Sequence, residues 1–247
     1  LFDLVISGGH ILDPSQKLDG PGDLAIAGGR IAEAGGKIDP GRAPRHIDAT
    51  GCYVTPGLID LHAHGYWGVS HYGIDLDRYS LGRGVTTALD PGSAGAQTWP
   101  GFRHHVIEKA SSRLFALLNI SLAGMISPLV GECEELRYLD PALAARTVEE
   151  NRNLLVGIKV RLSRKLVGAN RVEPLQRALE AAEMAGAWLM VHIGDTYSPL
   201  DEIMARLRPG DVVTHCFQGK QHQVIDEAGR VLPGVWQAVE RGVRLDV

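Results

Sequence analysis

Two histidines stand one residue apart at the end of an apolar segment, in the stretch Pro56-Gly57-Leu58-Ile59-Asp60-Leu61-His62-Ala63-His64. Alternate residues of a β-strand point to the same face, so His62 and His64 can reach one ion together from a strand end. Neutral imidazole is a good ligand for zinc and similar divalent metals. The plainer interpretation is a pair of surface histidines after a strand. The apolar residues before His62 favour the metal site, because they indicate a buried strand.

Three further candidate ligands close short apolar segments, namely Lys159, His192 and His215. Their separations of 33 and 23 residues are each close to one strand–helix unit, which places them at the carboxyl ends of successive strands. Taken singly, each histidine is more often a hydrogen-bonded core residue, and Lys159 can extend its amine to solvent. A buried lysine is costly unless it is neutralised or paired. Because these explanations would all have to hold independently, the set favours a metal centre at one edge of a sheet.

The chain after Val54 alternates between short apolar runs and amphipathic stretches, which predicts a parallel sheet covered by helices. Seven strand signals lie at 58–61, 85–89, 114–120, 155–160, 188–193, 212–214 and 243–247. They fit a doubly wound sheet or a (β/α)8 barrel whose seventh strand is the last one present. On the barrel interpretation the sequence is a fragment, and we expect an open edge that makes it unstable or aggregation-prone alone.

Residues 1–55 lack helical periodicity and predict a small all-β unit, with a strand at 4–6, a turn at Gly8-Gly9 and a hairpin at Gly28-Gly29. The division expected is therefore 1–55 and 56–247.

Composition narrows the class of protein. The chain has 247 residues and a net charge of −4 without a basic stripe, which disfavours nucleic-acid binding. No apolar run is long enough to cross a membrane. Three widely spaced cysteines indicate a reducing compartment, so we expect a cytoplasmic protein. The partner expected is a small-molecule substrate, and a homo-oligomer stays open.

These motifs resemble the amidohydrolase superfamily of metal-dependent hydrolases, and within it the dihydroorotase-like branch. The resemblance rests on the stretch that ends at His64, on Gly84-Val85-Thr86-Thr87, and on the loop Asp90-Pro91-Gly92-Ser93-Ala94-Gly95-Ala96. It implies an α/β fold: a TIM-type (β/α)8 barrel, truncated in strand 7, with residues 1–55 as part of a flanking β-sandwich. Some members of this subgroup, often labelled dihydroorotase, hydrolyse N-acetyl amino acids or acetylated hydroxy acids.

The resemblance also implies roles for the candidate ligands. His62 and His64 would bind the first of two divalent metal ions, with zinc expected, and His192 and His215 the second. Lys159 would bridge the ions as a carbamate formed with CO2, which makes it the catalytic lysine. A hydroxide shared by the metals would then attack a C–N amide bond, or a related acetyl ester, of a small carboxylate-bearing substrate such as an N-acyl amino acid.

Two positions depart from the family pattern. The family's eighth strand carries an aspartate that acts on the proton, and Asp246 lies on the wrong strand for that role. Dihydroorotases usually place an arginine where this chain has Tyr66, and a phenol does not replace a guanidinium fork. Arg161, on the same strand face as Lys159, is the candidate to bind the substrate's acid group; a solvated loop arginine is the alternative.

Two other functions stay open. A catalytically silent scaffold of the same fold would show only background hydrolysis with zinc or manganese. A mononuclear deaminase of the same superfamily would need no bridging lysine, so Lys159→Ala would leave its metal content unchanged.

Overall fold

The computed structural model describes residues 1–246, which form two compact units: Leu1–Leu58 and a second unit that begins at Ile59. The first unit contains a five-stranded sheet with the order β3-β2-β1-β4, and β5 also pairs with β1. Its strands are β1 (Leu4–Asp13), β2 (Leu18–Ala27), β3 (Arg30–Ala34), β4 (His46–Asp48) and β5 (Tyr53–Val54). The hairpin predicted at Gly28-Gly29 joins β2 to β3.

The turn predicted at Gly8-Gly9 is wrong. β1 runs through both glycines, and its register against β2 shifts between Ile6 and Gly9. The irregular residues are Ser7 and Gly8, and Gly8 has φ = +76°, so this segment forms a bulge within one long strand. The small core of this unit consists of Phe2, Val5, Ala25 and Ile38.

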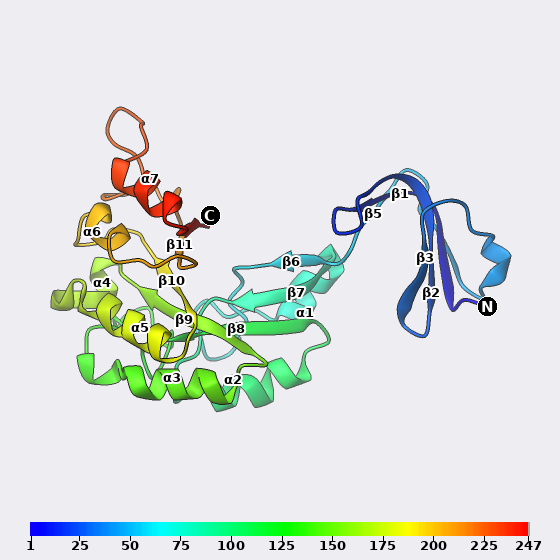
Figure 1. Cartoon of the computed structure of the whole chain (residues 1–247). Coiled ribbons are helices and arrows are strands. Elements are labelled where there is room, and N and C mark those ends of the chain that lie inside the picture. Colours follow the sequence, from blue (N-terminus) through cyan, green and yellow to red (C-terminus); the bar gives the residue numbers. More distant parts are fainter. Residues whose placement is uncertain (247) are drawn as a thin grey trace. The chain divides into compact units, whose positions relative to one another are not determined.

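The second unit is a curled seven-stranded sheet whose strands lie in sequence order from β6 to β12 (Figure 1). They are β6 (Leu58–Asp60), β7 (Val85–Asp90), β8 (Arg113–Asn119), β9 (Leu155–Arg161), β10 (Trp188–His192), β11 (Val212–Thr214) and β12 (Arg244–Leu245). The pairs from β7 to β12 are parallel. This order is that of a barrel, since a doubly wound sheet reverses its order at a switch point. A strand is present at each of the seven predicted positions; Val247, the last residue of the prediction at 243–247, lies outside the described residues.

Helices cover one face of this sheet, and α2, α3 and α5 run along it (Figure 1). The helices are α1 (Leu76–Ser80), α2 (Trp99–His105), α3 (Pro141–Glu150), α4 (Arg164–Val167), α5 (Glu173–Met184), α6 (Leu200–Met204) and α7 (Pro233–Glu240). α3 shows how the sequence sets a helix start: the Asp140 carboxylate accepts a hydrogen bond from the Leu143 amide, and Pro141 occupies the first turn.

The two faces of β9 carry different side chains. Ile158 and Val160 are buried in the core shared with the helices. By strand alternation Lys159 and Arg161 point to the opposite, concave face. The strand therefore supplies two cationic side chains to the inside of the curled sheet. Within residues 1–246, no helix combines the length and apolar character that crossing a membrane requires.

Candidate metal centre

One cavity of about 310 Å³ collects the predicted site residues. Its walls are formed by His62, His64, Tyr72, Lys159, Arg161, His192 and His215. The five predicted metal ligands and the predicted substrate-binding arginine thus lie around a single space, although they are spread over more than 150 residues of sequence. Tyr72 lines the cavity as well, although no motif in the sequence indicates a role for it.

The strand ends deliver these side chains. His62 and His64 follow β6, Lys159 lies within β9, His192 ends β10, and His215 follows β11. Neighbouring rings are close: the centroid distance is 5.7 Å between His62 and His64, 4.8 Å between His62 and His215, and 4.9 Å between His192 and His215. His215 has φ = +67°, an uncommon backbone conformation for a residue with a Cβ, and such outliers concentrate at functional sites.

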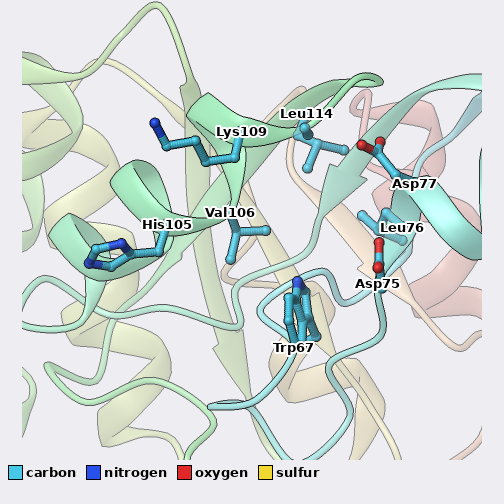
Figure 2. Close-up of a pocket in the computed structure, with 9 residues that line it drawn as sticks. Trp67, Asp75, Leu76, Asp77, His105, Val106, Lys109 and Leu114 are labelled. Atoms are coloured by element: carbon cyan, nitrogen blue, oxygen red, sulfur yellow. The ribbon is translucent and has the colours of Figure 1, made fainter.

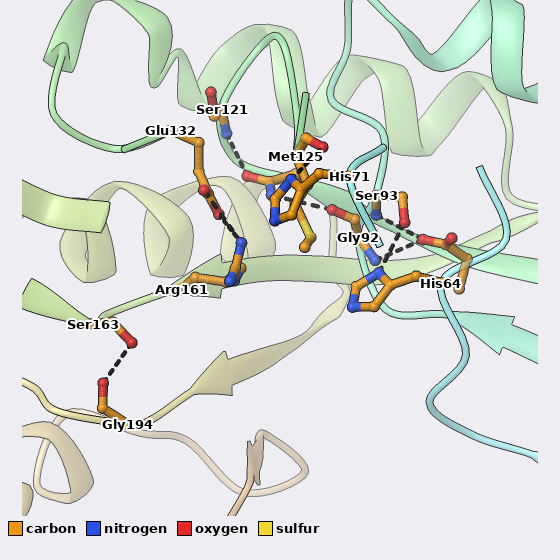
Figure 3. A network of polar contacts seen from close by, with 12 residues as sticks. His64, His71, Gly92, Ser93, Ser121, Met125, Glu132, Arg161, Ser163 and Gly194 are labelled. Atoms are coloured by element: carbon orange, nitrogen blue, oxygen red, sulfur yellow. Dashed lines mark hydrogen bonds and ion pairs between the residues drawn. The ribbon is translucent and has the colours of Figure 1, made fainter. Parts of the chain in front are cut away.

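Hydrogen bonds fix two of the imidazoles through their Nδ1 atoms. His62 Nδ1 lies 3.2 Å from Asp246 Oδ2 and 3.1 Å from Thr214 Oγ1, and the Thr214 hydroxyl donates to the same carboxylate oxygen at 2.7 Å. His64 Nδ1 lies 2.8 Å from Ser93 Oγ (Figure 3). Contacts of this kind orient ligand histidines and select their tautomer. Asp246 follows β12, the seventh strand, as predicted, but its contact with His62 was missed.

The electrostatics keep the imidazoles neutral. Burial, and then the positive charge of Lys159, lowers the pKa of His64 to about 2. Burial and the neighbouring His62 lower the pKa of His215 to about 4. The pKa values of His62 and His192 are lowered mainly by burial too. Neutral imidazoles retain the lone pair that a metal ion needs.

Lys159 is an unusual buried amine. The residue is 1% exposed, and its Nζ has no hydrogen-bond partner among residues 1–246. Burial, followed by the charge of Arg161, lowers the pKa of Lys159 to about 7. At neutral pH a large fraction of this amine is therefore unprotonated and nucleophilic.

The donor set fits divalent cations. The described residues contain no group of three or more His, Cys, Asp or Glu side chains that could hold a metal ion by itself. The four imidazoles instead form neighbouring pairs that share a cavity with the Lys159 amine, which has no hydrogen-bond partner among the described residues. The side chains that could hold divalent cations here are therefore these four imidazoles together with Lys159.

Arg161 is buried, so the interpretation as a solvated loop arginine is wrong. Its Nη1 donates to Glu132 Oε1 at 3.2 Å (Figure 3). Its guanidinium carbon lies 5.8 Å from the centroid of the Tyr72 ring. Tyr66, at the position where dihydroorotases carry arginine, points elsewhere: its ring stacks on Phe102 at 4.7 Å.

A second cavity, of about 200 Å³, lies beside α1 and α2 and is lined by none of these residues (Figure 2). Its carboxylates serve local structure. Asp75 accepts the Arg78 amide at the start of α1, and Asp77 accepts the amides of Ser111 and Ser112. We assign no chemistry to this space.

The curled parallel sheet and the nitrogen ligands at its strand ends define a TIM-barrel protein with a candidate metal centre. The chain is 34% identical to a deacetylase of Agrobacterium fabrum, over 91% of this chain and 56% of that protein. It is also 34% identical to a deacetylase of Enterococcus faecalis, over 100% of this chain and 65% of that protein. The chain thus spans between about half and two thirds of these curated relatives. No family model matches it.

Solved structures agree with the fold. An adenine deaminase superposes with a TM-score of 0.88 at 33% identity, over 100% of this chain and 65% of that one. A dihydroorotase superposes with a TM-score of 0.86 at 32% identity, over 98% and 64%. The chain belongs to the amidohydrolase superfamily. The predicted barrel class is confirmed, with the additional sheet in the first unit.

Proposed function

We propose that the protein is a metal-dependent amidohydrolase that cleaves a C–N amide bond, or a related acetyl ester, of a small carboxylate-bearing molecule such as an N-acyl amino acid. One observation carries the proposal: the buried Lys159 amine, which has no hydrogen-bond partner among the described residues, shares its cavity with four neutral histidines. The relatives named deacetylase and dihydroorotase support amide chemistry. We also propose that residues 1–55 are part of a β-sandwich and 56–247 part of the barrel.

In this proposal His62 and His64 would hold one divalent ion, His192 and His215 would hold a second, and zinc is the metal expected. Lys159 would react with CO2 through its neutral amine, forming an N–C bond and losing a proton, and the resulting carbamate would supply anionic oxygen ligands to the metal ions. The pKa of about 7 supports this step, because only the free amine attacks CO2. When bound, the ions supply Lewis acidity to the scissile carbonyl and acidify water.

The remaining roles fall to side chains of the chain itself. Arg161 binds the substrate carboxylate through its guanidinium donors. Ser93 holds His64, while Thr214 and Asp246 hold His62. We place the protein in the cytoplasm, since all three cysteines, Cys52, Cys133 and Cys216, are free thiols. Its partner is a small-molecule substrate, and assembly with further copies stays open.

The test compares the protein with its Lys159→Ala variant, both purified without chelator. We expect about two metal ions per chain in the wild type by elemental analysis, and hydrolysis within a panel of N-acetyl amino acids. Lys159→Ala should lose metal and reduce hydrolysis by more than about 100-fold, beyond the usual cost of an outer contact. Lys165→Ala, at an exposed lysine on α4, is the matched control.

Two outcomes would overturn the proposal. Background hydrolysis in a fully metal-loaded wild type would favour the silent scaffold. Unchanged metal content and activity in Lys159→Ala would favour a mononuclear deaminase.

A further inference from the structure

We propose that Glu132 is a positioning residue that fixes the guanidinium of Arg161 for a substrate carboxylate; the inference rests on the proposed function. The two side chains form a buried ion pair, with exposed fractions of 3% for Glu132 and 8% for Arg161. The glutamate lies in the segment between β8 and α3, far from every sequence motif that indicated chemistry.

The geometry of the pair leaves the arginine able to bind a second anion. Both contacts start from one nitrogen: Nη1 lies 3.2 Å from Oε1 and 3.4 Å from Oε2 of Glu132. Arg161 makes no other side-chain hydrogen bond within the described residues. The N–H groups of Nε and Nη2 therefore remain available to donate to a ligand. Because Arg161 lines the cavity with the histidines, these donors are the ones available to a ligand there. A guanidinium has five N–H donors, enough for two carboxylates at once.

The backbone around Glu132 is held firmly. The amide of the next residue, Cys133, donates to the Leu166 carbonyl at 2.9 Å, and the Asn170 side chain donates to the Cys133 carbonyl at 2.9 Å. Cys133 itself is fully buried. The backbone next to Glu132 is therefore fixed by hydrogen bonds. A side chain that positions its neighbour requires such a rigid attachment.

The positive charge of Arg161 explains why residue 132 carries a carboxylate. A buried guanidinium without a counterion is strongly destabilising. Glu132 neutralises Arg161 while the cavity holds no anion, and both of its oxygens hold the Nη1 nitrogen of the guanidinium. The ring of Tyr72 lies 5.8 Å from the guanidinium carbon and limits its movement from another direction. A substrate carboxylate then meets an arginine that needs no further ordering, which reduces the entropy cost of binding.

Two conservative variants of Glu132 separate the effect of side-chain length from the effect of charge. Glu132→Asp keeps the charge but withdraws the acceptor by one methylene, whereas Glu132→Gln keeps the reach and an acceptor oxygen without the charge. The probes are N-methanesulfonyl-alanine and its primary amide. They differ in the carboxylate alone, and a sulfonamide takes the place of the scissile N-acyl bond. The primary amide is checked for turnover before its affinity is measured. Affinities are measured by calorimetry on the metal-loaded protein, with metal content determined for each variant.

We expect the wild type to prefer the acid over the amide. Glu132→Asp should lower that preference about 10-fold while the affinity for the amide and the metal content stay unchanged, and Glu132→Gln should keep it within about 3-fold. The inference is overturned if the wild type shows no preference, if Glu132→Asp retains it, or if both variants lose it, since the last result would mark Glu132 as a counterion only. Failure of the proposed function shows separately, as absent hydrolysis in a protein that still prefers the acid.

Discussion

Hydrogen bonds from single side chains set the ring orientation and the tautomer of the cavity histidines. Ser93 Oγ lies 2.8 Å from His64 Nδ1, so the other ring nitrogen, Nε2, is the one available to a metal ion. Replacing Ser93 by alanine removes the partner and lets the ring change orientation and tautomer. We expect Ser93→Ala to weaken zinc binding about 10- to 100-fold, measured by competition with a chelator of known affinity.

Ser121→Ala is the matched control for Ser93→Ala. Ser121 is equally buried, but its hydroxyl has no hydrogen-bond partner among the described residues. Its removal should leave zinc affinity unchanged. Equal zinc affinity in Ser93→Ala and wild type would refute the orienting role of the serine.

The candidate ligands could be predicted from sequence, whereas their supporting contacts could not. Lys159, His192 and His215 each end an apolar run, and strand alternation sets the face they occupy. The contact of His62 with Asp246 spans 184 residues and that of Arg161 with Glu132 spans 29. Such pairs depend on register and loop path, which no local pattern records. The roles of the ligands stay predictions.

At the scale of elements, the loop after β7 is shaped by the strand it packs on. Gly92 has φ = +99°, and a Cβ built there would lie 2.5 Å from Lys159 Cβ and 2.7 Å from Lys159 Cγ. These atoms are close to the backbone of a central strand and cannot move aside. We therefore expect Gly92→Ala to lower the free energy of unfolding by about 2 kcal/mol or more, from overpacking and backbone strain together.

Denaturant titration checks this prediction, with Gly82→Ala as the control. A Cβ at Gly82 meets no atom within 4 Å, and its φ is not positive. That substitution should change the free energy of unfolding by less than about 0.5 kcal/mol. If Gly92→Ala were equally neutral, the close packing of the loop on Lys159 would be disproved.

Glycines also show why one element was predicted wrongly. Gly8-Gly9 has the local pattern of a turn, yet a Cβ at Gly9 would lie 2.6 Å from Val54 Cγ2. The glycine is needed because β5 approaches β1 closely there. The requirement for glycine at position 9 comes from Val54, which lies 45 positions away in the sequence. The local sequence pattern therefore could not distinguish a bulge from a turn. The strands of the barrel sheet were predictable because each is an apolar run with its own boundary signals.

At the scale of the whole molecule, the buried histidines couple stability to pH. The four imidazoles of the cavity have lowered pKa values in the folded protein, about 2 for His64 and about 4 for His215, whereas unfolded imidazoles titrate near 6.5. Below that pH the unfolded chain binds more protons than the folded chain, so stability rises with pH and falls on acidification. We expect the metal-free protein to lose stability between about pH 6.5 and pH 4.

Other groups do not reverse this slope. Carboxyls with lowered pKa values, such as Asp23, lose their contribution only below their unfolded pKa of 3.8. Asp90, whose pKa is raised by burial, acts in the opposite direction but is one group against four.

Denaturation midpoints at pH 7.5, 6 and 5 in the presence of chelator measure the effect. His64→Gln should flatten the dependence of stability on pH, because glutamine takes up no proton in either state. His105→Gln, at an exposed histidine on α2, should leave that dependence intact. A midpoint that stayed constant or rose on acidification would mean that the cavity does not hold its imidazoles neutral.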